Sequence, residues 1–301
     1  MRHKPVLLKE TLELLKLGPG MTVVDGTLGS GGHSMEIVKQ IGPHGRLIAL
    51  DRDPEALERA KHSIPESAAA MSFFNENFKN LPQVLQKLNI SSVNAVLLDV
   101  GFSSDQLDEP ARGFSFEKEG PLDMRLNQQE SVATAADFVA DLPEHELENI
   151  FREYGEERFA RRIARAICWR REKEPIQTTA QLAAAVISAI PGARSRGTRP
   201  YFKKHPAMRV FQALRIAVND ELGSLREGLE NIWPYLHCGG RLGVISFHSL
   251  EDRIVKRKFL AWKEDGSGEI VTRKPLEASE AELAENSRAR SAKLRVVEKK
   301  G

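Results

Sequence analysis

The sequence predicts an α/β fold with a mostly parallel, Rossmann-like sheet and an inserted all-helical domain. Short apolar runs alternate with helical patterns over residues 1–108, and three of these runs end at an aspartate: Asp25, Asp51 or Asp99. Strands that are apolar on both faces are typical of parallel sheets covered by helices on both sides. The alternation then stops, and no convincing strand pattern occurs over residues 109–205. We therefore expect a sheet domain formed by residues 1–108 and 206–301, and a helical insertion formed by residues 109–205.

The first elements follow in order from local patterns. An amphipathic helix is expected over residues 6–15, stopped by the Gly-Pro-Gly sequence at 18–20. The β-branched run at 22–24 predicts a strand that ends at Asp25. After a glycine-rich loop, a helix pattern ends at Gly42, and residues 46–50 predict the second strand. Asp53 followed by Pro54 predicts the N-cap and first turn of the next helix.

The remaining elements are predicted from periodicity in the same way. Residues 71–74 and 95–98 predict strands, with a helix over 81–88 between them. The insertion has three helical patterns, over 147–154, 159–167 and 182–190, the last behind Thr178 and Thr179 as candidate caps. The sheet domain is expected to resume with one long helix over residues 206–229. A strand at 241–247, a helix opened by a capping box at 249–252, and strands at 270–272 and 294–297 complete the chain.

The loop after Asp25 holds four glycines within seven residues: Gly26, Gly29, Gly31 and Gly32. Glycine permits a sharp turn and the close approach of a ligand. The helix that follows offers unpaired N–H groups at its N-terminus. The sequence therefore predicts that this loop holds a nucleotide-like cofactor.

The spacing in the loop favours one cofactor over another. Ser34 stands where a dinucleotide fingerprint beginning at Gly29 has its third glycine. Asp25 at the mouth of the loop would repel a pyrophosphate but suits an ammonium or sulfonium group, and S-adenosylmethionine carries both. Asp51, at the end of the second strand, is expected to accept hydrogen bonds from the ribose hydroxyls.

The overall composition bounds the function class. The chain has 301 residues, 41% of them hydrophobic and 29% charged, which is ordinary for a globular protein. The net charge of +2 barely favours an acidic partner. Two cysteines seventy residues apart, without ligand spacing around them, argue against a structural zinc or a disulfide framework. No apolar segment is long enough to span a bilayer, so a cytoplasmic protein without a membrane partner is expected.

Two basic segments bear on RNA binding. The segment at 192–209 has aromatic residues Tyr201 and Phe202 and no acid, and it holds six basic residues: Arg194, Arg196, Arg199, Lys203, Lys204 and Arg209. Arginine interleaved with aromatics is typical of phosphate contact and base stacking. The segment at 158–173 is also basic, but nearby glutamates can pair with it, so a solvated helix face and an RNA contact both stay open.

Several strings in this order closely resemble the bacterial 16S ribosomal RNA cytosine-N4 methyltransferases (RsmH, formerly MraW). The resemblance covers essentially the whole chain and lies in residues 25–34 (DGTLGSGGHS), 99–108 (DVGFSSDQLD), 112–116 (RGFSF), 120–125 (GPLDMR), 205–215 (HPAMRVFQALR), 245–253 (ISFHSLEDR) and 288–295 (RARSAKLR).

The resemblance implies a class I fold that uses S-adenosylmethionine, and as partner 16S rRNA in the small ribosomal subunit, where a cytosine of the decoding centre is methylated. No metal is implied, and a homodimer is left open. The cofactor contacts implied by the family fall on Gly31, Gly32, His33, Asp51, Phe78, Asp99 and Gln106.

Individual residues keep alternative interpretations. Phe78 is interpreted as lying against the adenine or as a core aromatic, and His33 as a cofactor contact or a helix cap. Asp99, or a backbone carbonyl just after it, is expected to orient the target amine and is the catalytic candidate. Gln106 and Asp123 are secondary candidates for cofactor or substrate contact.

Other function classes stay open from the residues alone. A DNA cytosine-N4 methyltransferase is the nearest alternative, but the double-proline motif usual in those enzymes is absent after Asp99. A ribosome assembly factor that binds RNA and the cofactor without methyl transfer is a second alternative. An NAD-dependent oxidoreductase is a third, which the departure from the dinucleotide fingerprint weakens.

Overall fold

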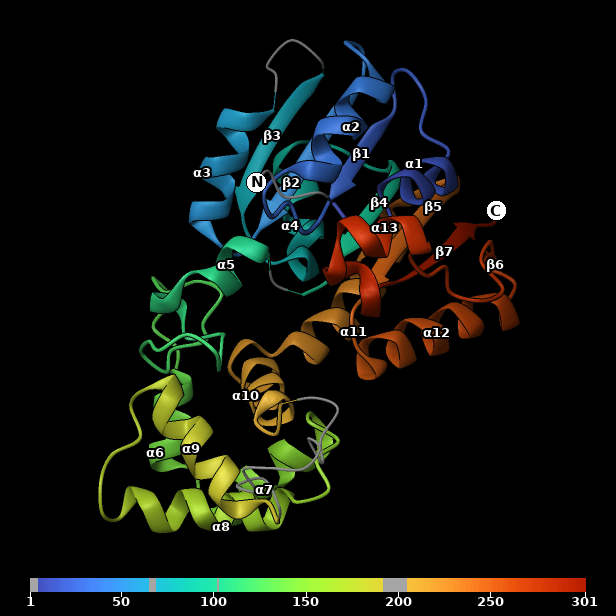
Figure 1. Ribbon diagram of the computed structural model, residues 1–301. Coiled ribbons are helices and arrows are strands. Elements are labelled where there is room, and N and C mark those ends of the chain that lie inside the picture. Colours follow the sequence, from blue (N-terminus) through green and yellow to red (C-terminus); the bar gives the residue numbers. More distant parts are fainter. Residues whose placement is uncertain (1–4, 65–68, 102, 192–204) are drawn as a thin grey trace. The chain divides into compact units, whose positions relative to one another are not determined.

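The computed structural model describes residues 5–64, 69–101, 103–191 and 205–301. The chain divides into two compact units (Figure 1). Met1–Gly101 and Leu222–Gly301 form the sheet unit, and Phe102–Glu221 form the helical unit. The basic residues and aromatics predicted to contact RNA at positions 192–204 lie outside the described residues.

The sheet unit is built on seven strands in the order β3-β2-β1-β4-β5-β7-β6. β1 to β5 run parallel, whereas β7 pairs antiparallel with both β5 and β6. The mostly parallel sheet predicted from the sequence is confirmed. The strands are β1 (Thr22–Asp25), β2 (Arg46–Asp51), β3 (Ala70–Asn75), β4 (Val93–Asp99), β5 (Leu236–Ser246), β6 (Gly268–Ile270) and β7 (Lys293–Lys299).

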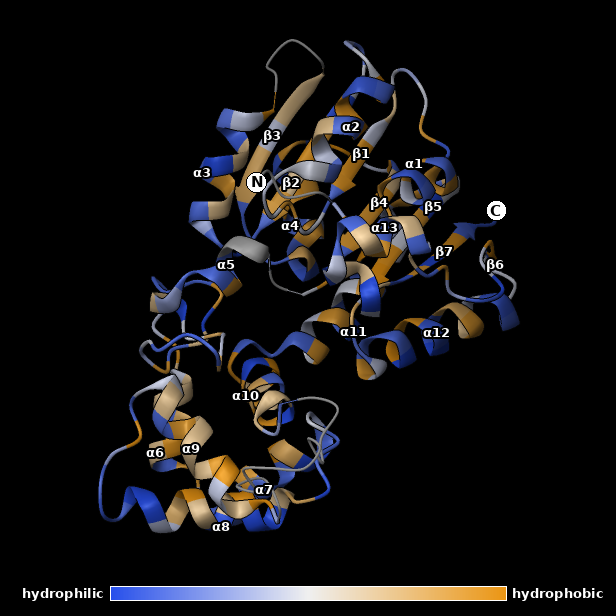
Figure 2. Cartoon of the chain, in the orientation of Figure 1, coloured by the Kyte–Doolittle hydropathy of each residue, from blue (hydrophilic) through white to orange (hydrophobic). Residues whose placement is uncertain are grey.

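Helices cover both faces of this sheet. Successive strand residues point to opposite sides, and because apolar side chains occur on both sides, each face is buried against helices. Leu97 packs into a core with α1 (Leu8–Leu15), α2 (Gly32–Ile41) and α3 (Pro54–Ser63), and α13 (Glu280–Glu285) adds Leu283 to that side. Leu98 packs into a second core with α4 (Leu81–Lys87), α11 (Glu221–Ile232) and α12 (Ser249–Glu264). The strands are mostly coloured as hydrophobic in Figure 2, as burial on both faces requires.

The helical unit has its own hydrophobic core, centred on Phe151, Ile163, Leu182 and Leu214. Thr134 and Thr178 cap α6 and α9 through capping boxes. The helices are α5 (Ser104–Asp108), α6 (Ala135–Asp141), α7 (Glu144–Glu153), α8 (Ala160–Arg171), α9 (Thr179–Ala189) and α10 (Met208–Asn219). Of these, α6 and the short α5 were not predicted from the sequence.

The long helix expected over 206–229 is wrong. The structure has two helices, α10 and α11, separated at Asp220, whose φ of 47° is left-handed. Because Val210 and Leu214 of α10 are buried in the core of the helical unit, that unit ends at residue 221 rather than 205. It also begins at residue 102 rather than 109, since Leu107 packs against the same core.

Three smaller differences concern the ends of elements. β5 begins at Leu236 rather than at residue 241 and ends at Ser246 rather than at residue 247. The N-cap of α12 is His248, paired with Glu251, instead of a box beginning at Ser249. The first of the last two expected strands lies at Gly268–Ile270 rather than 270–272. Across the described part of the chain, no helix is long and apolar enough to cross a membrane.

Candidate functional site

Three aspartates meet at one edge of the sheet unit. Asp51, Asp25 and Asp99 are the last residues of β2, β1 and β4, which are neighbours in the parallel sheet. Carboxyl ends of adjacent parallel strands lie at the same sheet edge, where such folds bind ligands. The charge of Asp25 raises the pKa of both other carboxyls, so the three groups act on one another electrostatically.

Asp25 is buried and hydrogen-bonded at both oxygens. The Ser34 hydroxyl donates to Oδ2 at 2.6 Å, and the Thr27 backbone N–H donates to Oδ1 at 3.2 Å. Burial raises the pKa of Asp25 to about 6, because it outweighs the opposing effect of these hydrogen bonds. Ser34, the residue in place of the third glycine, therefore serves as a partner for the carboxyl group.

Asp51 connects the glycine loop to β2. Its Oδ2 accepts a hydrogen bond from the Gly29 N–H at 2.7 Å, and its Oδ1 accepts one from the Asp53 N–H at 2.8 Å. Burial again dominates and raises the pKa of Asp51 to about 6. Asp53 caps α3 by accepting from the Glu55 N–H at 3.0 Å, as predicted.

Asp99 is the least satisfied of the three. Its backbone N–H donates to the Thr27 hydroxyl oxygen at 2.6 Å, and its Oδ2 lies 3.7 Å from Nδ1 of His33. Its Oδ1 is buried and has no hydrogen-bond partner among the residues described. Burial, followed by the charges of Asp25 and Glu251, raises the pKa of Asp99 to about 8. A buried acceptor without a partner costs about 1–3 kcal/mol, which indicates a donor supplied by a ligand.

His33 bridges this edge and the N-terminal segment. It is the second residue of α2, and its Nε2 lies 3.0 Å from the Val6 carbonyl oxygen. The N-cap of α2 is Gly31, so the alternative that His33 caps the helix is wrong. With one ring nitrogen at Val6 and the other near Asp99, the imidazole is held in a fixed orientation.

Gly31 and Gly32 are also required for close packing at the start of α2. Gly31 has a φ of 78°, and a Cβ there would lie 3.2 Å from atoms of Ala60 and Ile64. A Cβ on Gly32 would lie 3.1 Å from the Pro5 ring. These two glycines therefore let α2 begin in close contact with α3 and with the N-terminal segment.

Phe78 follows β3 and is partly buried against the core on the α4 side of the sheet. Its ring approaches Gly228 of α11 so closely that a Cβ there would lie 2.5 Å from two ring atoms. Packing against α11 is the core role considered for this residue, and it leaves part of the side chain accessible.

The two secondary candidates belong to the helical unit instead. Oε1 of Gln106 accepts from the Ser103 N–H at 2.8 Å, at the start of α5. Arg125 binds both oxygens of Asp123, at 2.9 Å and 2.8 Å. Although burial opposes it, this pairing lowers the pKa of Asp123. Local contacts thus occupy polar atoms of both side chains.

The chemistry of the aspartate edge fits S-adenosylmethionine. A cation at this edge would relieve the mutual repulsion of three carboxyls whose pKa values are raised by burial. A pyrophosphate would add negative charge to the same edge. Oδ1 of Asp99, to which no described residue donates a hydrogen bond, provides an acceptor for an N–H group.

Comparison of the sequence with models of protein families shows the family to which the chain belongs. The model of the MraW methylase family matches residues 1–300. The chain belongs to the MraW methylase family.

Relatives of this MraW-family chain share nearly its whole length. Each of three is named ribosomal RNA small subunit methyltransferase H. The protein of Halothermothrix orenii is 45% identical over 99% of both chains. That of Carboxydothermus hydrogenoformans is 47% identical over 99% of this chain and 97% of its own. That of Geobacter sulfurreducens is 48% identical over 99% and 98%. Among solved structures, an rRNA methylase from Streptococcus thermophilus is 11% identical, with a TM-score of 0.44 over 100% of this chain and 99% of its own.

Some site residues of this MraW-family chain were missed by sequence reasoning. Thr27 and Ser34 support Asp99 and Asp25, and Glu251 adds its charge to the same edge. Glu251 is 2% exposed and accepts from the Phe247 N–H at 2.8 Å. Ser34 could have been identified from its position in the glycine loop. Thr27 and Glu251 had no sequence feature that pointed to them, other than lying in segments that resemble the family.

Proposed function

We propose that this protein transfers a methyl group from S-adenosylmethionine to N4 of a cytosine in 16S rRNA of the small ribosomal subunit. The observation that carries the proposal is the buried, unpartnered Oδ1 of Asp99 within a cluster of three carboxyls. Membership of the MraW methylase family and the names of the relatives support the reaction class and the RNA substrate.

Most of the residues proposed to hold the cofactor belong to the sheet unit, at or near the aspartate edge. Asp51 would bind the ribose hydroxyls, since each carboxylate oxygen can accept a second hydrogen bond beside its backbone partner. Phe78 would lie against the adenine with its accessible part. The remaining proposed contacts are Gly31, Gly32, His33, Asp99 and Gln106.

When bound, S-adenosylmethionine supplies an activated methyl group on a sulfonium. The task of the protein is therefore to prepare the nucleophile, because the lone pair of the cytosine amine is delocalised into the ring. Oδ1 of Asp99 would accept one amine N–H and fix the direction of the lone pair. In well-aligned intramolecular reactions, positioning contributes up to about 7–11 kcal/mol.

The raised pKa of Asp99 suits a second task. The cation of bound S-adenosylmethionine would favour the ionised form of Asp99, and a carboxylate whose pKa is raised to about 8 is a stronger base than an ordinary one for the proton that the amine must lose. His33, 3.7 Å from the other carboxyl oxygen, would hold the group in place. A paired cytosine would first have to leave its stack, at a cost of a few kcal/mol, which favours a distorted or single-stranded RNA segment.

The test is transfer of a labelled methyl group to small subunits and naked 16S rRNA that lack the modification and, in a parallel reaction, to DNA, followed by nucleoside digestion and mass analysis. We expect label in N4-methylcytidine. Label in DNA cytosine would instead favour the DNA methyltransferase class. Cofactor binding without any label would favour an assembly factor. Action in the cytoplasm and a homodimer stay predictions.

A further inference from the structure

Helix α8 of the helical unit has two faces of different character. Its buried face consists of small and aliphatic residues, Ala160, Ile163, Ala164 and Ile167. The opposite face is rich in arginine. Hydrophobic and hydrophilic positions accordingly alternate along α8 (Figure 2).

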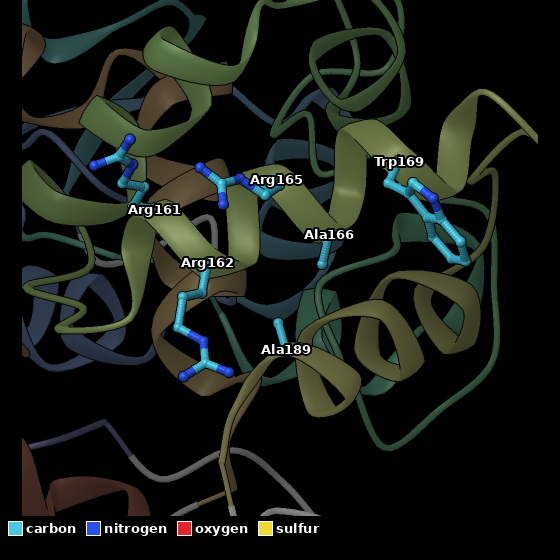
Figure 3. A pocket seen from close by; sticks show the side chains of 6 residues that line it. All are labelled: Arg161, Arg162, Arg165, Ala166, Trp169 and Ala189. Atoms are coloured by element: carbon cyan, nitrogen blue, oxygen red, sulfur yellow. The ribbon is translucent and has the colours of Figure 1, made fainter.

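The arginine-rich face borders a groove of about 680 Å³ against the end of α9 (Figure 3). The two alanines in its lining leave space because their side chains stop at Cβ. Figure 3 shows Arg162 extending from α8 on the side where Ala189 of α9 lies. The lining residues are Arg161, Arg162, Arg165, Ala166, Trp169 and Ala189.

The arginines of this groove differ from the structural arginine on the same helix. Nη1 of Arg171 donates to the carbonyl oxygens of Val139 and Leu142, at 2.7 Å each. Arg161 and Arg162 are exposed, and neither has a carboxylate partner within the part of the chain that the structure describes. Arg165 lies 3.7 Å from Glu144 across a solvated contact. Two guanidinium groups are thus available to an anionic partner.

Trp169 adds an aromatic surface to the same groove. It is 60% exposed, and Nζ of Lys173 lies 3.6 Å from the centre of its ring. One exposed aromatic is ordinary on a protein surface. A tryptophan beside unpaired guanidinium groups is the composition that binds single-stranded nucleic acid, through base stacking and phosphate contacts.

We propose that this groove, formed by α8 and the end of α9, is an RNA-docking surface. Arg161 and Arg162 contact phosphates, and Trp169 stacks on an unpaired base. A flexible acidic protein would satisfy the arginines but would leave the tryptophan ring unused. That the bound RNA is the 16S substrate rests on the proposed function; the binding of RNA itself does not.

The first test removes the two unpaired charges. The Arg161→Gln/Arg162→Gln double variant of the full chain is titrated with a labelled single-stranded oligoribonucleotide at several salt concentrations. We expect at least tenfold weaker binding. The slope of log K against log salt should become less steep by about 1.4, since each phosphate contact to a single strand contributes about 0.7. Arg46→Gln, an exposed arginine at the amino end of β2, is the matched control and should change neither quantity.

The second test follows Trp169 directly. The other two tryptophans, Trp233 and Trp262, are 9% and 5% exposed and stack at 3.9 Å, so acrylamide quenching reports mainly on Trp169. The oligoribonucleotide should protect the wild-type fluorescence from acrylamide. Trp169→Ala should weaken binding by about 5- to 100-fold, whereas Trp169→Phe should keep most of the affinity because a ring is still present. Equal protection by polyglutamate at the same ionic strength would overturn the RNA assignment in favour of an acidic protein.

An assay of methyl transfer tests the docking surface and the proposed function separately. With small subunits as substrate, the double variant should show a raised KM, an unchanged kcat and an unchanged affinity for S-adenosylmethionine. Wild-type affinity and salt slope in the double variant would refute the docking surface. If the wild type methylates no RNA while the variants still lose RNA binding, the proposed function fails and the docking surface stands.

Discussion

Asp99 shows how one carboxyl group can oppose the stability of the fold that holds it. Its pKa is about 8 in the folded protein and near 4 in an unfolded chain. Between these values the folded state binds a proton that the unfolded state does not. The free energy of unfolding therefore falls as the pH rises through this range, by up to about 1.4 kcal/mol per pH unit.

Replacing this carboxyl should reveal that cost. Asp99→Asn cannot ionise, so we expect its stability relative to the wild type to increase by about 2.6 kcal/mol between about pH 5 and about pH 7. Urea denaturation at the two pH values measures this. The same variant should lose methyl transfer by about 100-fold or more. The exposed Asp141→Asn is the control; a pH-independent difference for Asp99→Asn would contradict the raised pKa.

The three carboxyls also predict how cofactor binding depends on pH. Their pKa values are about 6 for Asp25 and Asp51 and about 8 for Asp99, and a cationic ligand favours the ionised forms. Affinity for S-adenosylmethionine should therefore rise with pH up to about pH 8, the highest of the three pKa values, with release of protons. Titration calorimetry in two buffers of different ionisation enthalpy counts those protons. Uptake of protons on binding would show that the carboxyls do not face the cation.

At the scale of elements, the sequence predicted those strands and helices whose formation depends on neighbouring residues. β1, β2 and β4 followed from short apolar runs, and their terminal aspartates placed the candidate site. The break at Asp220 was missed because apolar periodicity continues from α10 into α11, and neither glycine nor proline stands at the break itself. The contacts of Ser34 and Thr27 could not be predicted, since they depend on the loop conformation set by Gly29 and Gly31, with φ values of 52° and 78°.

Alanine variants of Gly31, at the start of α2, and of Gly20, before β1, can distinguish the free energy lost through backbone strain from that lost through packing. Gly31 and Gly20 have nearly equal φ values, 78° and 80°, but a Cβ on Gly20 would have no atom within 4 Å. Either alanine variant should lose about 1–2 kcal/mol through the left-handed backbone. Gly31→Ala should lose about 1–3 kcal/mol more, because Ala60 and Ile64 must move. Chemical denaturation measures both, and equal losses would show that α3 adapts without cost.

At the scale of the whole molecule, the apolar cores are separate. Among the residues that the structure describes, the core of the helical unit contains residues of 103–221 only, and the two cores of the sheet unit contain none of these. Because all three aspartates lie in the sheet unit, a ligand bound by them adds its binding free energy to that unit. The alternation of strand and helix patterns, which stops after residue 108, predicted a sheet domain and a helical insertion, but their boundaries depend on which core each helix joins.

Calorimetry of the full chain should therefore show two thermal transitions. S-adenosylmethionine at about 100 times its dissociation constant should raise the free energy of unfolding of the sheet unit by about 2.7 kcal/mol. The transition of that unit should therefore move to a higher temperature, whereas the transition of the helical unit should stay in place. Hydrogen exchange should assign the shifted transition to β1, β2 and β4, and the unshifted one to α7, α8 and α9. A single transition that shifts as a whole would show that the units unfold together.

The position of β7 has a consequence for synthesis of the protein. Lys293–Lys299 are synthesised after the other six strands of the sheet, yet this strand lies inside the sheet, between β5 and β6. Until it emerges, β5 has an open edge that another nascent chain could pair with. A premature stop codon just before Lys293 would remove an interior strand, so such truncations should aggregate during translation even though every proposed cofactor residue has been made.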